Sequence, residues 1–135
     1  PLLFGDGSGH SFPVYIDDVL DQIRLAATHP QAVGEAFNVS GPSVTWAQFL
    51  GYYARMSNRR LRRLPMPLAK ILAQLNKILH LGLPLTVDRL QYVSRHLSFS
   101  TEKAERLLGW RQKVSLDEGM QRSEAWLRQS GQLAR

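Results

Sequence analysis

Apolar residues recur at helical spacing in six segments of the chain and as short runs in a few others. A spacing of three to four residues places side chains on one face of an α-helix; it is found over residues 17–28, 46–56, 67–79, 86–93, 101–108 and 116–127. Short apolar or alternating runs at residues 2–4, 11–16, 36–39 and 97–99 predict strands. The pattern predicts a mixed α/β chain that is mainly helical, with too few strands for a doubly wound sheet.

Each predicted helix carries one apolar stripe that we expect to be buried. In the first helix it is formed by Val19, Ile23 and the Ala26/Ala27 pair. The stripe over 46–56 is aromatic, and we interpret it as core rather than as a stacking platform; it comprises Trp46, Phe49, Leu50, Tyr53 and Met56.

The stripe over 68–79 is the longest, with three polar residues on the opposite side. It comprises Leu68, Ile71, Leu72, Leu75, Ile78 and Leu79, facing away from Lys70, Gln74 and Lys77. Core packing is the first interpretation of this face. Covering a substrate, or contact with a membrane or a partner, are the alternatives. Residues 81–84 then break the helix.

The starts and stops of the helices are also marked in the sequence. Asp17 and Asp18 open the first helix, and we interpret them as caps rather than as an acid/base pair. Thr45 with Gln48 forms a capping box at the start of the second helix. His29-Pro30 ends the first helix.

Residues 100–126 encode two helices and the joint between them. Ser100 or Thr101 can cap the first, and Gly109 stands where a helix end needs a left-handed residue. Trp110 can then fold back on the last turn. Ser115 and Glu118 form a capping box for the closing helix, whose inner side is expected to carry Leu116, Met120, Ser123 and Trp126/Leu127. This stretch holds no chemically reactive group.

Composition and charge narrow the class of protein. The chain has 135 residues, and 44% of them are apolar, which is typical of one globular domain (residues 1–135). It contains no cysteine, which is compatible with a reducing, cytoplasmic compartment. The net charge of +6 includes arginines at positions 59, 60, 62 and 63. No nucleic-acid motif accompanies them. We interpret them as a solvated edge strand, with a grip on a phosphate or carboxylate as the alternative.

Candidate chemistry is sparse along the chain. The Gly5–Gly9 turn lacks the spacing and the following helix of a dinucleotide loop. The four histidines lack metal-ligand spacing, so we predict no metal site. No apolar run approaches the roughly 20 residues that a membrane span needs. We therefore predict no catalytic residue in this chain.

Two blocks of residues follow a pattern known from one enzyme family. The block near the C-terminus comprises Ser100, Lys103, Ala104, Leu108, Gly109 and Trp110, then Val114, Ser115, Leu116, Glu118 and Gly119. The other comprises the Gly5–Gly9 turn, the Val14–Val19 segment and the Gly34–Gly41 segment. Together they resemble the tail of the extended short-chain dehydrogenase/reductases, the NAD-dependent epimerase/dehydratase superfamily. The resemblance implies that residues 1–135 are the small C-terminal substrate-binding lobe of such an enzyme, without its Rossmann half.

The resemblance also implies a cofactor and partners. The full-length enzyme would use NAD or NADP, and no cofactor is expected on this chain alone. The family's catalytic pair, Tyr-x-x-x-Lys, is missing, because Val19, Met56, Ser57 and His96 follow the four tyrosines at that spacing. The partners of this chain would be a small-molecule substrate and the N-terminal Rossmann half. Without that half, apolar area would be exposed, which predicts self-association of the chain. The family's architecture makes seven residues candidate substrate contacts: His10, Ser11, Phe12, Tyr15, Arg60, Arg62 and Arg89.

Two departures bear on the substrate. Ser11 stands where nucleotide-sugar members carry an arginine, and Ser94-Arg-His-Leu97 replaces their Arg-Pro-Gly-Asp element. The apolar helix at 68–79 is more similar to the 3β-hydroxysteroid dehydrogenase-like branch, which acts on apolar alcohols or ketones. A nucleotide-sugar epimerase or dehydratase remains the alternative, as does a non-catalytic interaction module that uses the 68–79 helix.

Overall fold

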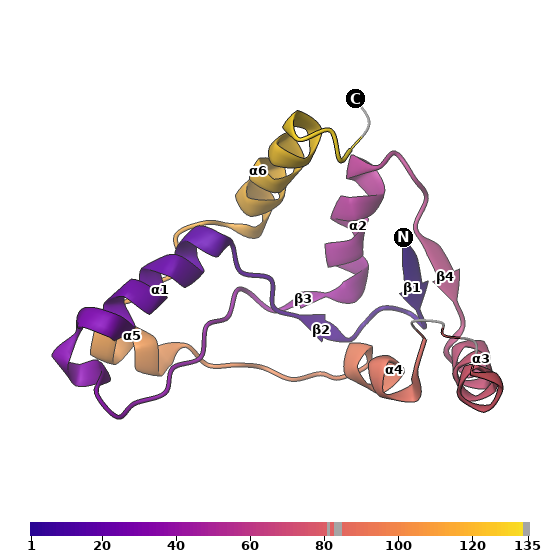
Figure 1. Cartoon of the computed structure of the whole chain (residues 1–135), viewed down its shortest axis with the longest axis horizontal. Coiled ribbons are helices and arrows are strands. Elements are labelled where there is room, and N and C mark those ends of the chain that lie inside the picture. Colours follow the sequence, from indigo (N-terminus) through magenta and orange to yellow (C-terminus); the bar gives the residue numbers. More distant parts are fainter. Residues whose placement is uncertain (81, 83–84, 134–135) are drawn as a thin grey trace. The chain divides into compact units, whose positions relative to one another are not determined.

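A computed structural model describes residues 1–80, 82 and 85–133, which form two compact units (Figure 1). Unit 1 comprises Pro1–Ser11 and Val44–Leu97, and unit 2 comprises Phe12–Ser43 and Ser98–Arg135. The chain therefore passes between the units three times. Each unit contains residues from distant parts of the sequence.

Unit 1 is built on two small sheets. Strand β1 (Leu2–Phe4) pairs in parallel with β4 (Arg62–Leu64), with Leu3 opposite Arg63. Strand β2 (His10–Ser11) pairs antiparallel with β3 (Val44–Thr45). The parallel pair confirms a strand at residues 2–4, and the arginine run supplies its partner.

Three helices complete unit 1: α2 (Trp46–Met56), α3 (Met66–Leu79) and α4 (Val87–Val93). A core of Ala69, Ala73 and Leu90 joins α3 to α4, and Phe4 and Leu64 of the parallel sheet pack against it. The small alanines allow α3 to approach its neighbours closely. Thr45 and Gln48 form the predicted capping box at the start of α2.

Unit 2 consists of helices α1 (Ile16–Thr28), α5 (Glu102–Leu108) and α6 (Leu116–Gln129), with a 3₁₀ turn, η1 (Pro30–Ala32). Its core contains Ala104, Leu108 and Trp110, against which Leu25 and Phe37 pack. Gly109 adopts φ +64° at the end of α5, as the sequence predicts. The turn thereby brings the buried Trp110 back onto α5.

The fold class predicted from the sequence is confirmed. The described residues contain six α-helices and only short strands. The two helices at residues 102–129 and the joint between them are present. The capping box expected at Ser115 is only half formed: the Ser115 hydroxyl accepts the Glu118 amide N–H at 3.2 Å, while the Glu118 carboxylate binds Arg122 instead of returning to the backbone.

The expected burial of two apolar stripes is wrong. On α1 the buried residues are Asp18 and Gln22, whereas Ile23 is 59% exposed. On α3 the buried residues are Ala69, Ala73 and Asn76, and all six residues of the predicted stripe are exposed. Trp126 of α6 is also exposed. The helical periods were right, but α1 faces unit 2 with Leu25 and Ala26 beside the buried Asp18 and Gln22, and α3 faces unit 1 with its small side.

Several strand predictions are also wrong. Residues 36–39 and 97–99 are not in strands, and only His10–Ser11 of the segment around 11–16 pairs with a neighbour. An extended segment becomes a strand only when another backbone lies beside it to exchange hydrogen bonds. Residues 81, 83 and 84 of the predicted helix break lie outside the described residues.

Candidate functional site

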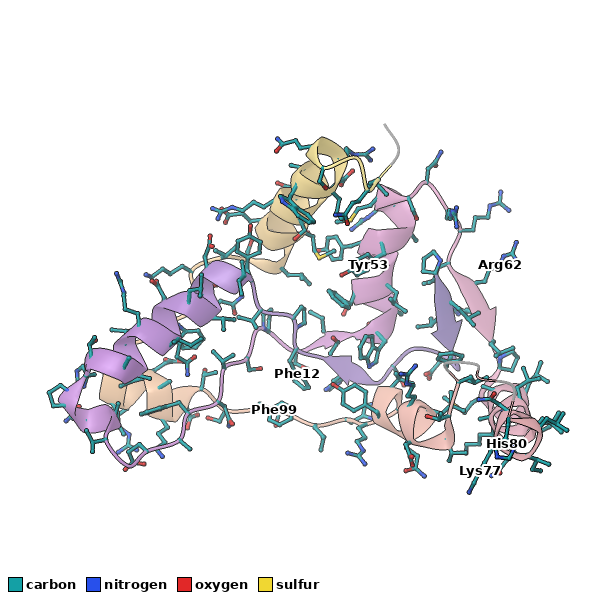
Figure 2. All side chains as sticks on the ribbon, viewed as in Figure 1. Phe12, Tyr53, Arg62, Lys77, His80 and Phe99 are labelled. Carbon is teal, nitrogen blue, oxygen red and sulfur yellow. The ribbon has the colours of Figure 1, made fainter. Side chains whose placement is uncertain are left out.

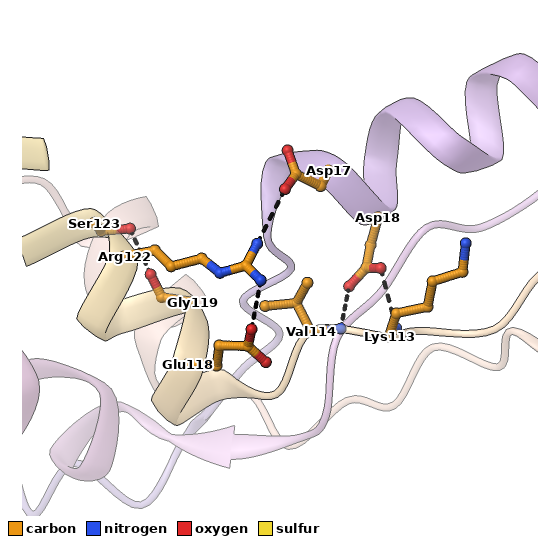
Figure 3. Close-up of polar contacts among 8 residues, drawn as sticks. All are labelled: Asp17, Asp18, Lys113, Val114, Glu118, Gly119, Arg122 and Ser123. Atoms are coloured by element: carbon orange, nitrogen blue, oxygen red, sulfur yellow. Dashed lines mark hydrogen bonds and ion pairs between the residues drawn. The ribbon is translucent and has the colours of Figure 1, made fainter. Parts of the chain in front are cut away.

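The first turn of α1 holds a buried carboxylate that fastens the joint between α5 and α6. Asp18 is only 1% exposed. Its two carboxylate oxygens accept the backbone N–H groups of Lys113 and Val114, both at 3.0 Å (Figure 3). Its own carbonyl accepts the Trp110 indole N–H at 3.0 Å. Asp18 therefore anchors residues 110–114 rather than capping its own helix.

The helix cap predicted for the aspartate pair is therefore wrong. Tyr15 occupies the cap position, with no side-chain cap bond. Asp17 instead receives a hydrogen bond from Arg122 at 3.2 Å, and Arg122 also binds Glu118 (Figure 3). The hydrogen bond that Arg122 donates to Glu118 and the negative charge of that carboxylate raise the pKa of Arg122. The two sequence blocks that carry the family resemblance thus meet in space as a structural joint.

Two lysine–carboxylate pairs reinforce unit 2 at its surface. Lys113 binds Asp21, and this hydrogen bond lowers the pKa of the Asp21 carboxyl. Lys103 binds Glu35 and lowers the pKa of that carboxyl in the same way. Because both carboxylates are exposed to solvent, these pairs tune the pH dependence of unit 2 more than they hold it together.

The predicted substrate residues of the N-terminal segment fall into different environments. His10 and Ser11 form β2; the His10 ring lies 5.1 Å from that of His96, and Ser11 is buried. Phe12 contacts Phe99 edge to face at 5.0 Å (Figure 2). Tyr15 lies beneath the Arg122 guanidinium, 5.4 Å from ring centroid to carbon. Their role in binding a substrate stays a prediction.

Tyr15 also explains a glycine of the closing helix. A Cβ on Gly119 would lie 3.1 Å from the Tyr15 ring. The glycine thus permits the close approach of α6 to Tyr15. The Tyr15 ring is packed as part of the structural joint.

The predicted arginine contacts lie on separate elements of unit 1. Arg62 is exposed on β4 (Figure 2), Arg60 precedes that strand, and Arg89 lies in α4. Since β4 pairs with β1, Arg62 belongs to a different sheet from His10 and Ser11. His10 and Ser11 share β2, and the other five candidates lie on other elements or in loops.

Two features were missed in the sequence. The indole N–H of Trp46 is buried with no hydrogen-bond partner among the described residues; it adjoins β3, which pairs with the His10 strand. The other is an open groove of about 520 Å³ in unit 2, with Gly41, Phe99 and Trp110 in its lining. The aromatic stripe over residues 46–56 predicts that Trp46 packs against other side chains, but it does not predict that the indole N–H lacks a hydrogen-bond partner within the described part of the chain.

The described residues also bear on metal and membrane chemistry. Over the part of the chain that the structure describes, no cluster of three or more histidines and carboxylates is arranged to hold a metal ion. Nor is any described helix both long enough and apolar enough to pass through a lipid bilayer.

Comparisons with known proteins identify the fold. No protein-family model matches the chain, and no curated protein is significantly similar to it. Solved structures do match, and several of the most similar are named as epimerases or dehydratases. An epimerase from Methanothermobacter thermautotrophicus is 21% identical, with a TM-score of 0.71 over 97% of this chain and 33% of its own.

Two further matches were solved with ligands. UDP-glucose 4-epimerase from Thermotoga maritima, solved with UDP-glucose, is 25% identical, with a TM-score of 0.66 over 96% of this chain and 35% of its own. UDP-glucuronic acid 4-epimerase from Bacillus cereus, solved with UDP-glucuronic acid and NAD, is 17% identical, with a TM-score of 0.63 at the same coverages.

These matches confirm the expected fold. The chain spans about a third of the length of the structures it matches. The chain shares its fold with a part of these epimerases and dehydratases, as the resemblance in its sequence implies. At these levels of identity the match describes the fold, and the activity is a separate question.

Proposed function

We propose that this chain is the substrate-recognition portion of an NAD(P)-dependent epimerase, dehydratase or oxidoreductase. The observation that carries the proposal is the fold match, which covers 97% of this chain but only 33% of a known epimerase. The absence of a Tyr-x-x-x-Lys pair from this chain supports the proposal that it recognises the substrate while another part of the enzyme carries the catalytic pair. The chain alone would be inactive, and it would act with an N-terminal Rossmann half that holds NAD or NADP.

Within this function, the chain's own residues would bind and orient the substrate. His10 and Ser11 are held in place by the β2–β3 pair. The bound cofactor would exchange a hydride with a carbon that bears oxygen. Arg62, in the same unit as His10 and Ser11, would contribute a cationic contact.

A nucleotide sugar is the second candidate substrate, beside an apolar alcohol or ketone. The exposed Arg62 supports it, since a guanidinium binds phosphate with two parallel hydrogen bonds. The T. maritima epimerase solved with UDP-glucose supports it as well. Ser11 stands against it, because the family resemblance places an arginine there in nucleotide-sugar enzymes.

The coding sequence upstream of Pro1 provides the first test. We expect a glycine-rich strand–turn–helix and a Tyr-x-x-x-Lys pair there, and a different domain would overturn the proposal. Isothermal titration of NAD and NADP into the 135-residue chain is the second test. We expect no saturable binding, so low-micromolar affinity would contradict the proposal.

The substrate class can be tested with a matched pair of arginine variants in the longer polypeptide. Arg62 and Arg63 are adjacent on β4, so their side chains leave opposite faces of the strand. If a nucleotide sugar binds, Arg62→Ser should weaken the binding of UDP by roughly ten-fold or more, as for a lost charge-assisted contact. Arg63→Ser should leave it within two-fold. Equal effects would exclude a specific phosphate contact at Arg62.

A further inference from the structure

Helix α3 presents a continuous apolar face to solvent. Among the six residues of this face, Ile71 is 57% and Ile78 is 67% exposed. The other four are Leu68, Leu72, Leu75 and Leu79, and all are exposed. Such a large contiguous apolar surface is typical of an interaction site rather than of a solvated helix.

The packing of α3 fixes which side faces outward. Ala69 and Ala73 are at most 1% exposed in the core of unit 1. The Asn76 side-chain amide donates to the Leu85 carbonyl at 2.8 Å, one turn further along the same side. The helix is therefore attached to unit 1 through its small side, which leaves the side with leucines and isoleucines outward.

The segment of the chain that contains α3 carries charge of a single sign. No acidic residue occurs between Glu35 and Asp88, a stretch that holds five arginines and two lysines. Unit 1 as a whole carries nine basic and two acidic residues, a net charge of +7. Unit 2 carries eight basic and nine acidic residues, a net charge of −1. The positive charge of the chain is thus concentrated in the unit that contains α3.

We propose that α3 lies on an anionic membrane surface, with its apolar face among the acyl chains and the basic residues of unit 1 near the lipid phosphates. A helix that combines a leucine-rich face with lysines binds the bilayer interface in this way. Arg62 on β4 and Lys77 on α3 are among these basic residues (Figure 2). With 14 residues, α3 is too short to span a bilayer.

The charge pattern favours a membrane over a second copy of this chain. A second copy of unit 1 would carry the same net charge of +7, so pairing two α3 faces would bring two strongly positive units together, with no acidic residue on the helix to offset the repulsion. An anionic lipid surface satisfies the apolar face and the cations together. This inference concerns the outer face of unit 1 and does not depend on the proposed function.

Vesicle flotation of the 135-residue chain tests the proposal. We expect binding to vesicles of 30% phosphatidylglycerol in phosphatidylcholine, and at least ten-fold weaker binding to pure phosphatidylcholine. A Lys70→Gln, Lys77→Gln double variant should bind the anionic vesicles about ten-fold more weakly, since each basic residue near such a surface contributes several-fold. Raising the salt to 0.5 M should have a similar effect.

The apolar contribution is tested with two matched isoleucines. The side chain of Ile71 on α3 is 57% exposed and that of Ile23 on α1 is 59% exposed. Ile71→Glu should abolish vesicle binding, whereas Ile23→Glu should leave it unchanged. Circular dichroism of both variants should show an unchanged helix content, because both side chains are exposed. Equal loss in the two variants would overturn the proposal.

Other occupants of the face give different results. Equal binding to the two vesicle types, or no binding, overturns the proposal. So does a dimer in sedimentation velocity that Ile71→Glu dissociates, because a second copy would then cover α3. Loss of vesicle binding when the longer polypeptide replaces the 135-residue chain would assign the face to the remainder of the enzyme, which also overturns it.

Discussion

Replacing Asp18 with alanine or asparagine is expected to destabilise unit 2 strongly. The carboxylate of Asp18 is buried and accepts the backbone N–H groups of Lys113 and Val114. Alanine removes both acceptors and leaves two amide groups without partners inside the protein. Asparagine keeps one acceptor oxygen, but it turns an NH₂ group toward the other amide N–H.

The magnitude follows from the two bonds. A hydrogen bond to a charged group contributes about 1.5–3 kcal/mol, and an orphaned buried donor costs a similar amount. Since these two costs overlap, we expect Asp18→Ala to lower the free energy of unfolding by about 3–5 kcal/mol. Asp18→Asn should lower it by about 2–3 kcal/mol. Either loss is large against the total stability of about 5–15 kcal/mol that is usual for a domain.

Urea unfolding followed by circular dichroism measures the loss, and Asp17→Asn is the matched control. Asp17 is the neighbouring residue, but its side chain is 59% exposed and forms a surface ion pair with Arg122. Its replacement should cost less than about 1 kcal/mol. Amide hydrogen exchange gives a local measurement: the N–H groups of Lys113 and Val114 should lose protection in the Asp18 variants.

Two results would refute this reasoning. One is an Asp18→Asn variant that is no less stable than Asp17→Asn. The other is retained exchange protection at the two amides in Asp18→Ala. Either would mean that Asp18 does not hold the joint between α5 and α6 in solution.

Three further predictions concern pH, glycines and association. Hydrogen bonds from lysines lower the pKa of Asp21 below 3.8 and that of Glu35 below 4.5. The stabilisation of unit 2 by these two ion pairs should therefore be complete above about pH 5 and be lost as the pH falls through the lowered pKa values. A urea midpoint that stays constant between pH 6 and 3 would contradict this. A Cβ on Gly41 would lie 1.6 Å from the Pro13 carbonyl oxygen, whereas a Cβ on Gly51, within α2, would have nothing within 4 Å. Gly41→Ala should therefore prevent unit 2 from folding. Gly51→Ala should raise the thermal midpoint, with a gain of about 0.5–1 kcal/mol in the free energy of unfolding. Self-association of the chain at high concentration stays a prediction, which a monomer in light scattering would contradict.

Local signals in the sequence predicted the helices and their ends well. The Thr45–Gln48 box, the left-handed Gly109 and the start of α6 at Ser115 follow from short-range hydrogen bonding. These features depend on residues within a few positions of one another. They form largely independently of what the rest of the chain does.

The parts that could not be predicted depend on distant neighbours. A hydrophobic period marks the stripe on α3, but it does not say whether another segment covers it. Asp18 looks like a helix cap because its partners, Lys113 and Val114, are 95 and 96 residues away. For the same reason, the sequence could not indicate which candidate substrate residues share a surface.

The three crossings between units have a consequence for folding during synthesis. All of unit 1 has left the ribosome once residue 97 has emerged, whereas unit 2 also needs residues beyond 98. We therefore expect residues 12–43 to wait as an open loop until Val114 arrives to meet Asp18. Closing such a distant contact is slow compared with forming a helix. During that interval Leu25 of α1 lacks the core of unit 2 on which it packs, and it depends on chaperones or on rapid elongation to escape aggregation.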